Sequence, residues 1–319
     1  WASSIAAAST IAANAFSWVG WRIGALAKRV GCYALFNAGT ATIAIAIMLP
    51  AAFFAGTTLP LFTVTLLRAG QGERSIGRVY AWNTLGSILG VFAAIHLLIP
   101  VIGLKLTLCF AALVDIAIGL VLLRMQAHDK RSMLRFAGAV SLSALCLIFA
   151  VKLPFDPLML ASGVFRHGRS ELAASSTVLF YRDGKTASIS VVGSSQGSAH
   201  IATNGKPDAA IMLRDDSPPS EDEPTMAIAA LLPLTMLDAP DRVGVIGFGS
   251  GLTTHTLLGD KRVLSVDTVE IEQAIVDGAR NFGKRVRRAY EDPRSNIIIE
   301  DAKSYFSSKR EKYDVIISE

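Results

Sequence analysis

The sequence predicts a multi-domain protein: an α-helical transmembrane bundle, then a small β-rich domain, then a Rossmann-like α/β domain of the methyltransferase type. Long apolar runs fill the first half, short β-prone runs between turns follow, and strand and helix patterns then alternate. We place the three domains at 1–153, 154–235 and 236–319. Because the chain starts at Trp1 and stops at Glu319 inside a strand–helix series, we expect it to be cut at both ends, with the last domain incomplete.

Composition supports a membrane protein and argues against a nucleic-acid partner. Hydrophobic residues make up 51% and charged residues 18% of the 319 residues, whereas a soluble chain carries about a quarter charged residues. Residues 1–153 hold 12 Lys/Arg against three acidic residues, and residues 154–319 hold 19 against 23. The basic excess therefore belongs to loops that flank apolar helices. The three cysteines have no metal-binding spacing, so we expect no metal.

Six apolar segments approach the ~20 residues that a helix needs to cross hydrocarbon. They are 1–20, 31–49, 51–67, 83–101, 106–123 and 136–151. Pro50 predicts a turn or a broken helix between the second and the third. Asp115 lies at membrane depth, which indicates either a functional group or a helix-packing hydrogen bond.

Every second gap between these segments, starting with the first, is rich in Lys and Arg. The positive-inside rule predicts that these basic gaps lie in the cytoplasm. If all six segments crossed, residues from 154 onward would lie outside. We expect instead that 136–151, the shortest segment, does not cross. The chain is then a multi-pass protein of the inner (plasma) membrane, with its C-terminal part in the cytoplasm.

The middle of the chain predicts a small antiparallel sheet. Short β-prone runs alternate with turns, and Asn204-Gly205 is a further hairpin signal. The acidic, proline-rich stretch 214–224 predicts a solvated loop, and the alternative is that its acidic residues attract a polycation. These residues are Asp215, Asp216, Glu221, Asp222 and Glu223. Residues 225–237 predict a helix.

From residue 242 the pattern is strand, glycine loop, helix, strand, helix, strand. Such a series builds a parallel sheet that binds its ligand at the carboxyl ends of the strands. The loop glycines Gly247, Gly249 and Gly251 let the backbone approach a ligand closely. Glu270, 21 residues after Gly249, is placed to accept hydrogen bonds from both hydroxyls of a ribose. Asp301 is placed to accept a hydrogen bond from an adenine amino group.

The loop lacks the third, widely spaced glycine of a dinucleotide fingerprint. This favours a ligand like S-adenosylmethionine over NAD. The alternative is a doubly wound domain with a degenerate pocket.

Several motifs together resemble the spermidine synthase family. They are 231–234, 243–251, 266–271, 292–294, 300–302 and 313–319. The stretches 78–86 and 98–103 resemble the membrane half of bacterial proteins that fuse a transporter-like helix bundle to a spermidine synthase-like domain.

The resemblance implies a site for decarboxylated S-adenosylmethionine beside a polyamine. Its nucleoside part would be Gly247, Gly249, Gly251, Glu270, Asp301 and Ala302. Glu319 stands where the family has a catalytic Asp, and Thr225-Met226 stands where it has a Tyr-His pair. A family Gln is also missing, with Ala187 in its expected place.

The chain is thus predicted to be a membrane-anchored transferase that binds S-adenosylmethionine or its decarboxylated form. It would transfer an aminopropyl group to a polyamine or another amine. The alternatives are a methyltransferase that uses the same pocket and a transporter or sensor regulated by a nucleoside-binding domain. The expected partners are the amine, the lipid bilayer and a second copy of the chain in a homo-oligomer.

Overall fold

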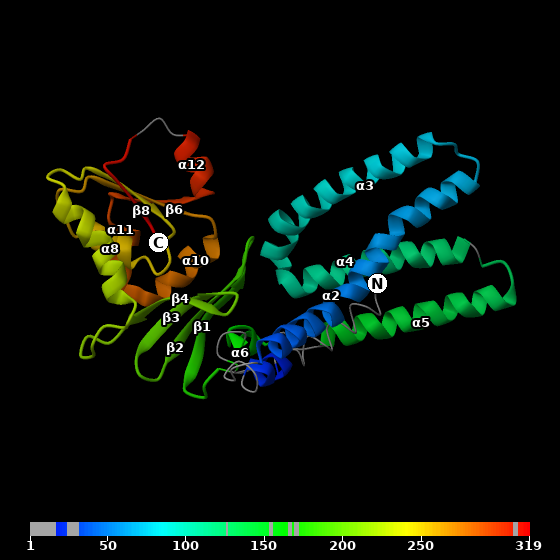
Figure 1. Cartoon of the computed structure of the whole chain (residues 1–319), viewed down its shortest axis with the longest axis horizontal. Coiled ribbons are helices and arrows are strands. Elements are labelled where there is room, and N and C mark those ends of the chain that lie inside the picture. Colours follow the sequence, from blue (N-terminus) through cyan, green and yellow to red (C-terminus); the bar gives the residue numbers. More distant parts are fainter. Residues whose placement is uncertain are drawn as a thin grey trace. The chain divides into compact units, whose positions relative to one another are not determined.

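The computed structural model describes residues 17–23, 32–125, 127–152, 156–164, 168, 172–308 and 312–319. The chain divides into two compact units, one helical and one mixed (Figure 1). The helical unit takes Trp1–Phe155 with His167–Ser170, and the mixed unit takes Asp156–Arg166 with Glu171–Glu319. The predicted further division at residue 235 stays a prediction.

The first long helix of the helical unit, α2, spans Tyr33–Arg68 and runs straight through Pro50 and Pro60. The predicted break at Pro50 is therefore wrong, and segments 31–49 and 51–67 form one helix of 36 residues. A proline removes one backbone hydrogen bond and crowds the preceding turn, but long apolar helices accommodate it by local adjustment. The segment 1–20 lies almost entirely outside the described residues.

The chain then turns back in two helical hairpins, α2 with α3 and α4 with α5 (Figure 1). These elements are α3 (Arg74–Ala93), the π-helical η1 (Ala94–Leu98), α4 (Ile99–Met125) and α5 (Lys130–Lys152). Gly103, with φ 77° and ψ 168°, interrupts α4 near its start. This break falls between the predicted segments 83–101 and 106–123. The predicted segment 136–151 is part of a longer helix of 23 residues.

Among the described residues, three helical stretches are long and apolar enough to cross a membrane. They are Tyr33–Arg68, Arg74–Met125 and Lys130–Lys152. Most of their large apolar side chains are exposed. Asp115 is half-buried on α4.

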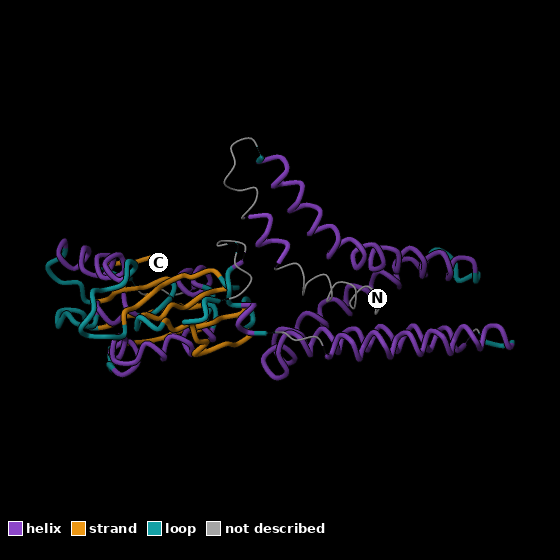
Figure 2. The backbone as a smooth tube through the Cα atoms, turned by 90° about the horizontal axis from the view of Figure 1, so that it is seen from below, coloured by secondary structure: helices purple, strands orange, loops and turns teal. Residues whose placement is uncertain are grey.

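The strands that the described residues form all lie in the mixed unit (Figure 2). Its antiparallel sheet follows the short helix α6 (Pro157–Leu160) and has the order β1-β2-β3-β4. The strands are β1 (Ser176–Asp183), β2 (Ser188–Ser194), β3 (Ser198–Thr203) and β4 (Lys206–Met212). Asn204 and Gly205 both have positive φ, 50° and 76°, as the predicted two-residue hairpin turn requires.

The second sheet of this unit is parallel, with the order β7-β6-β5-β8, and confirms the predicted strand–helix alternation. Its strands are β5 (Arg242–Ile246), β6 (Ser265–Glu270), β7 (Ser295–Ile299) and β8 (Val315–Ser318). Its helices are α8 (Glu223–Met236), α9 (Leu252–Leu257), α10 (Gln273–Ala279), the 3-10 helix η2 (Arg280–Val286), α11 (Arg287–Glu291) and α12 (Ala302–Ser308).

Two apolar clusters hold the mixed unit together. One joins the inner face of β2–β4 to α10 and to Phe248 of the glycine loop. The other joins α8 and α9 to the parallel sheet. The strand order reverses between β5 and β8, so a ligand crevice is expected beyond their carboxyl ends.

Candidate active site

The glycine loop connects β5 to α9 in a conformation that side chains oppose. Gly247, Gly249 and Gly251 all have positive φ, at 92°, 49° and 81°. A Cβ on Gly251 would lie 2.7 Å from the Phe248 ring, and one on Gly249 would lie 2.8 Å from the Glu319 Oε2 atom. The loop therefore needs glycine for its backbone shape and for the side chains packed against it.

Glu270 ends β6 directly beside this loop and is 5% exposed. Its Oε2 atom accepts the Phe248 N–H at 2.9 Å, and its Oε1 atom accepts the Glu272 N–H at 2.9 Å. Each carboxylate oxygen has a second lone pair, so the group can still accept two hydroxyls.

Glu319 follows β8 and lies against the same loop. Its N–H donates to the Ile246 carbonyl at 3.0 Å. The residue as a whole is exposed, but its carboxyl group is enclosed beside Gly249 and Thr253. Burial is the main cause that raises the pKa of this carboxyl, a hydrogen bond with Thr253 lowers it, and the negative charge of Glu270 raises it, so that the pKa is about 7. A carboxyl with a pKa near neutrality is suited to general-base work.

These groups face a cavity of about 580 Å³ between the two sheets of the mixed unit. The glycine loop, Glu270, Thr253 and Glu319 form one side, and β3, β4 and the start of α8 form the other. The charged residues of the lining are Lys206, Asp208, Asp222, Glu270 and Glu319. Four carboxyl groups against one ammonium group make the cavity suitable for a cationic ligand.

Sequence reasoning missed Asp208, and it gave Asp222 only as part of an acidic run that could attract a polycation. Asp208 lies on β4, and only the Asn204-Gly205 turn signal pointed to a strand there. The acidic stretch 214–224 was predicted to be a solvated loop, which is wrong at its end. Asp222 lines the cavity, and Glu223 is 5% exposed and ion-paired with Arg285.

Three other predicted site residues, Gly251, Asp301 and Ala302, lie outside the described lining of the cavity. Asp301 is exposed, and its Oδ1 atom accepts the Ser304 N–H at 2.8 Å at the start of α12, whose first residue is Ala302. Gly251 begins α9. Ala187 packs against the apolar cluster of the small sheet.

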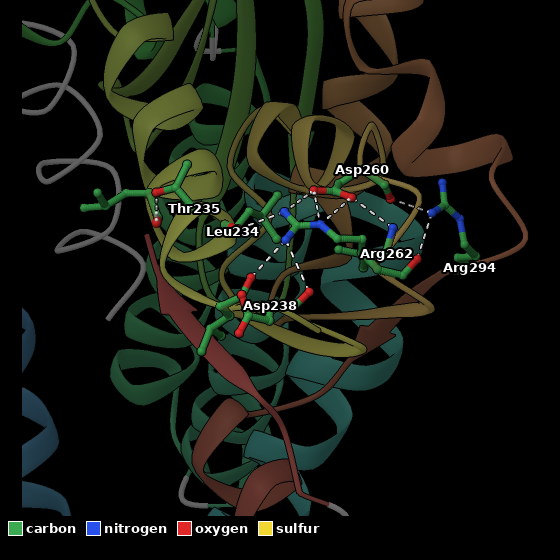
Figure 3. A network of polar contacts seen from close by, with 9 residues as sticks. Leu234, Thr235, Asp238, Asp260, Arg262 and Arg294 are labelled. Carbon is green, nitrogen blue, oxygen red and sulfur yellow. Dashed lines mark hydrogen bonds and ion pairs between the residues drawn. The ribbon is translucent and has the colours of Figure 1, made fainter.

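The Asp292-Pro-Arg294 motif lies at the opposite end of the sheet, just before β7. The Arg294 guanidinium donates to the carbonyls of Leu258 at 2.5 Å, Asp260 at 2.9 Å and Val263 at 2.8 Å. Figure 3 shows Arg262 nearby, which donates to the Leu234 and Leu237 carbonyls at the end of α8 and pairs with Asp260. Both arginines satisfy carbonyls that helix ends and loops leave unpaired, so this motif stabilises the fold.

The glycine loop at a switch point, with an acidic residue closing the second strand, is typical of nucleotide-binding α/β domains. The family described as "Spermine/spermidine synthase domain" matches residues 226–319. This stretch is therefore similar to the spermine/spermidine synthase domain. The match does not include the helical unit, whose resemblance to fused membrane proteins stays a prediction.

Similar proteins of known name are aminopropyltransferases. The chain is 38% identical over 78 residues to "Polyamine aminopropyltransferase" of Thermococcus onnurineus, which covers 24% of this chain and 28% of that protein. It is 31% identical over 113 residues to the Aeropyrum pernix protein of the same name (34% and 36%) and 36% identical over 87 residues to "Spermidine synthase 2" of Arabidopsis thaliana (27% and 26%). The chain thus spans about a quarter to a third of these relatives.

Two of the solved structures that match are described as spermidine synthases. One is the "Crystal Structure of Spermidine Synthase from Thermotoga Maritima", with 20% identity, a TM-score of 0.38 and coverage of 44% of this chain and 47% of that one. A second, with the same identity and TM-score, is titled as a complex with the transition state analogue AdoDATO and covers 44% and 45%.

Proposed function

We propose that the mixed unit is an aminopropyltransferase that binds decarboxylated S-adenosylmethionine and an amine in the 580 Å³ cavity. The observation that carries the proposal is the meeting of Glu270 and Glu319 at the glycine loop, inside a cavity rich in carboxyl groups. The family match of residues 226–319 supports it.

Charge favours the decarboxylated donor. Loss of the carboxylate leaves a donor with a sulfonium and an ammonium group, while S-adenosylmethionine itself would bring one more negative charge into the cavity. Asp208 and Asp222 are placed to meet ammonium groups on the side opposite the loop. A cavity lined by one sign of charge concentrates ligands of the other.

The proposed chemistry needs little beyond positioning and one base. The neutral amine nitrogen attacks the propyl carbon next to the sulfonium, a C–N bond forms, and the C–S bond breaks. The sulfur keeps the electron pair and leaves as a neutral thioether nucleoside. Glu319 takes the proton that the new ammonium group releases, and Glu270 holds the ribose so that the three reacting atoms stay in line.

Detection of the thioether nucleoside tests this function whichever amine is the acceptor. The full chain is incubated with decarboxylated S-adenosylmethionine and putrescine, spermidine or a longer diamine, and the nucleoside is measured by mass spectrometry. We expect amine-dependent release, slow with putrescine because Glu319 is longer than the family's Asp. Absence of release with every amine contradicts the proposal. Conversion of S-adenosylmethionine to its demethylated product would instead establish a methyltransferase.

We further propose that the helical unit anchors the protein in a bilayer with the mixed unit in the cytoplasm. Of the four long helices, α5 is the most amphipathic and the least apolar, which suits a helix lying along the membrane surface. If α5 does not cross, the mixed unit stays on the side of the basic loop at 124–135.

Cysteine labelling tests this topology. Cys32, Cys109 and Cys146 are replaced by alanine, and Ser217 in the exposed stretch before α8 is replaced by cysteine. An impermeant maleimide should fail to label intact cells and should label lysed cells. Labelling of intact cells would show that α5 crosses.

A further inference from the structure

A second buried carboxylate, Glu272, lies two residues after Glu270 and has no place in the proposed chemistry. It is 3% exposed, and it is absent from the described lining of the cavity. A carboxylate in such a position must be satisfied by hydrogen bonds, since burial without them is costly.

The partners of Glu272 come from the turn between β1 and β2. Its Oε2 atom accepts the Thr186 N–H at 2.8 Å and the Thr186 hydroxyl at 2.9 Å, and its Oε1 atom accepts the Ala274 N–H at 3.2 Å, capping α10. The turn fits closely around the carboxylate, because a Cβ on Gly184 would collide with it. Glu272 thus fastens the small sheet to the end of β6.

The backbone of Glu272 continues the connection to the ligand site. Its N–H donates to Glu270 Oε1, and Glu270 Oε2 accepts the Phe248 N–H from the glycine loop. Three consecutive steps therefore join the β1–β2 turn to the loop: turn to Glu272, Glu272 to Glu270, and Glu270 to Phe248.

We propose that Glu272 is a positioning residue that sets the orientation of Glu270 and so the affinity for the adenosyl donor. The proposal rests on the proposed function, in which Glu270 binds the ribose. Without the Glu272 carboxylate, the turn loses its anchor and the start of α10 loses its cap. The Glu272 N–H then no longer holds Glu270 in one rotamer, and Glu270 must be ordered again when the ligand binds.

Three variants of the full chain test this role. Glu272→Ala removes every acceptor. Glu272→Gln keeps an oxygen for Thr186 but turns an NH2 group toward the Ala274 N–H. Asp277→Asn is the matched control, because it breaks the Arg182–Asp277 ion pair, which also joins β1 to α10 but does not contact Glu270.

Calorimetry with decarboxylated S-adenosylmethionine should show about tenfold weaker binding for Glu272→Ala, the equivalent of one lost charge-assisted hydrogen bond. Glu272→Gln should fall between it and the wild type, and Asp277→Asn should match the wild type. Hydrogen exchange without ligand should be faster in Glu272→Ala at the segments 183–187 and 246–250, and unchanged at 246–250 in Asp277→Asn.

The two readouts separate the two proposals. If the wild type does not bind the donor but exchange at 246–250 responds to Glu272→Ala and not to Asp277→Asn, the coupling stands and the proposed ligand is wrong. If the folded Glu272→Ala and Glu272→Gln variants leave both affinity and exchange at 246–250 unchanged, Glu272 does not position Glu270. An equal loss of affinity in Asp277→Asn would also overturn the proposal, because any loosening of the sheet would then suffice.

Discussion

The two ends of the parallel sheet satisfy their backbone polar groups with side chains of opposite charge. At the carboxyl end, the carboxylates Glu270 and Glu272 accept backbone N–H groups, and Glu270 faces a cavity with lone pairs to spare. At the amino end, the guanidinium groups of Arg262 and Arg294 donate to six carbonyls between them. The carboxyl end therefore keeps hydrogen-bond acceptors for a ligand, whereas the guanidinium donors at the amino end are used for hydrogen bonds within the fold. Substitutions at the two ends should therefore separate binding and catalysis from stability.

The largest effect is expected at the carboxyl end, from Glu319→Gln. Loss of the base should lower the release of the thioether nucleoside at least about a hundredfold, because general-base help contributes roughly 10²–10⁴ in rate. Donor affinity should stay close to that of the wild type. A Gln variant that still releases nucleoside at the wild-type rate would remove Glu319 from the mechanism.

At the amino end, Arg294→Met should destabilise the mixed unit by about 3 kcal/mol, since three carbonyls lose a charged donor. Chemical denaturation followed by circular dichroism measures this. Arg287→Met is the control: its exposed ion pair with Glu291 at 3.7 Å should contribute under about 0.5 kcal/mol. If Arg294→Met weakened donor binding in the folded protein, the functional separation of the two ends would be wrong.

Sequence patterns predicted much of the fold of the mixed unit and part of the site at the carboxyl end of its parallel sheet. Periodicity and turn residues predicted both sheets, α8 and the glycine loop, because these depend on local preferences. They also placed Glu270 beside the loop, because the carboxyl ends of neighbouring parallel strands meet at one edge. The continuity of α2 through Pro50 was not predicted, because a long apolar helix can accommodate by local adjustment a proline that local preferences would place at a break.

The sequence also did not show which residues form the wall of the cavity opposite the glycine loop. Asp208 reaches it through the register of β3 with β4, and Asp222 through the placement of α8, and both are tertiary features. Likewise, the roles of Glu272 and Arg294 became visible only with their partners, which lie far away in the sequence.

The protonation of Glu319 gives a smaller effect that depends on pH. Its pKa is raised from 4.5 to about 7 in the folded protein, so the folded state holds a proton that the unfolded state loses. The wild type therefore loses stability as pH rises from about 4.5 to about 7. Glu319→Gln cannot titrate, so it should melt at a higher temperature than the wild type at pH 8 and at a similar temperature at pH 4.5. A difference that is the same at both pH values would show that the pKa of Glu319 is not raised.

The smallest effect concerns the length of the base. Glu319 is one methylene longer than the family's Asp, and misplacement of a reacting group by about 1 Å can lower a rate substantially. Glu319→Asp should therefore increase nucleoside release with putrescine several-fold. A lower rate would show that the cavity is built for the longer side chain and that the defect with putrescine lies at the amine side, where Thr225 and Asp208 are the first positions to vary.

The most direct test of the account is the affinity of the Glu270→Ala variant for decarboxylated S-adenosylmethionine, measured by calorimetry on the full chain. The ribose hydroxyls lose a charged acceptor worth about 1.5–3 kcal/mol, so affinity should fall by roughly 10- to 150-fold. Arg287→Met, at a residue that is not part of the described cavity lining, should bind as the wild type does. If Glu270→Ala, shown to be folded by circular dichroism, binds the donor with wild-type affinity, the adenosyl ligand does not lie at the carboxyl end of this sheet and the proposed site is wrong.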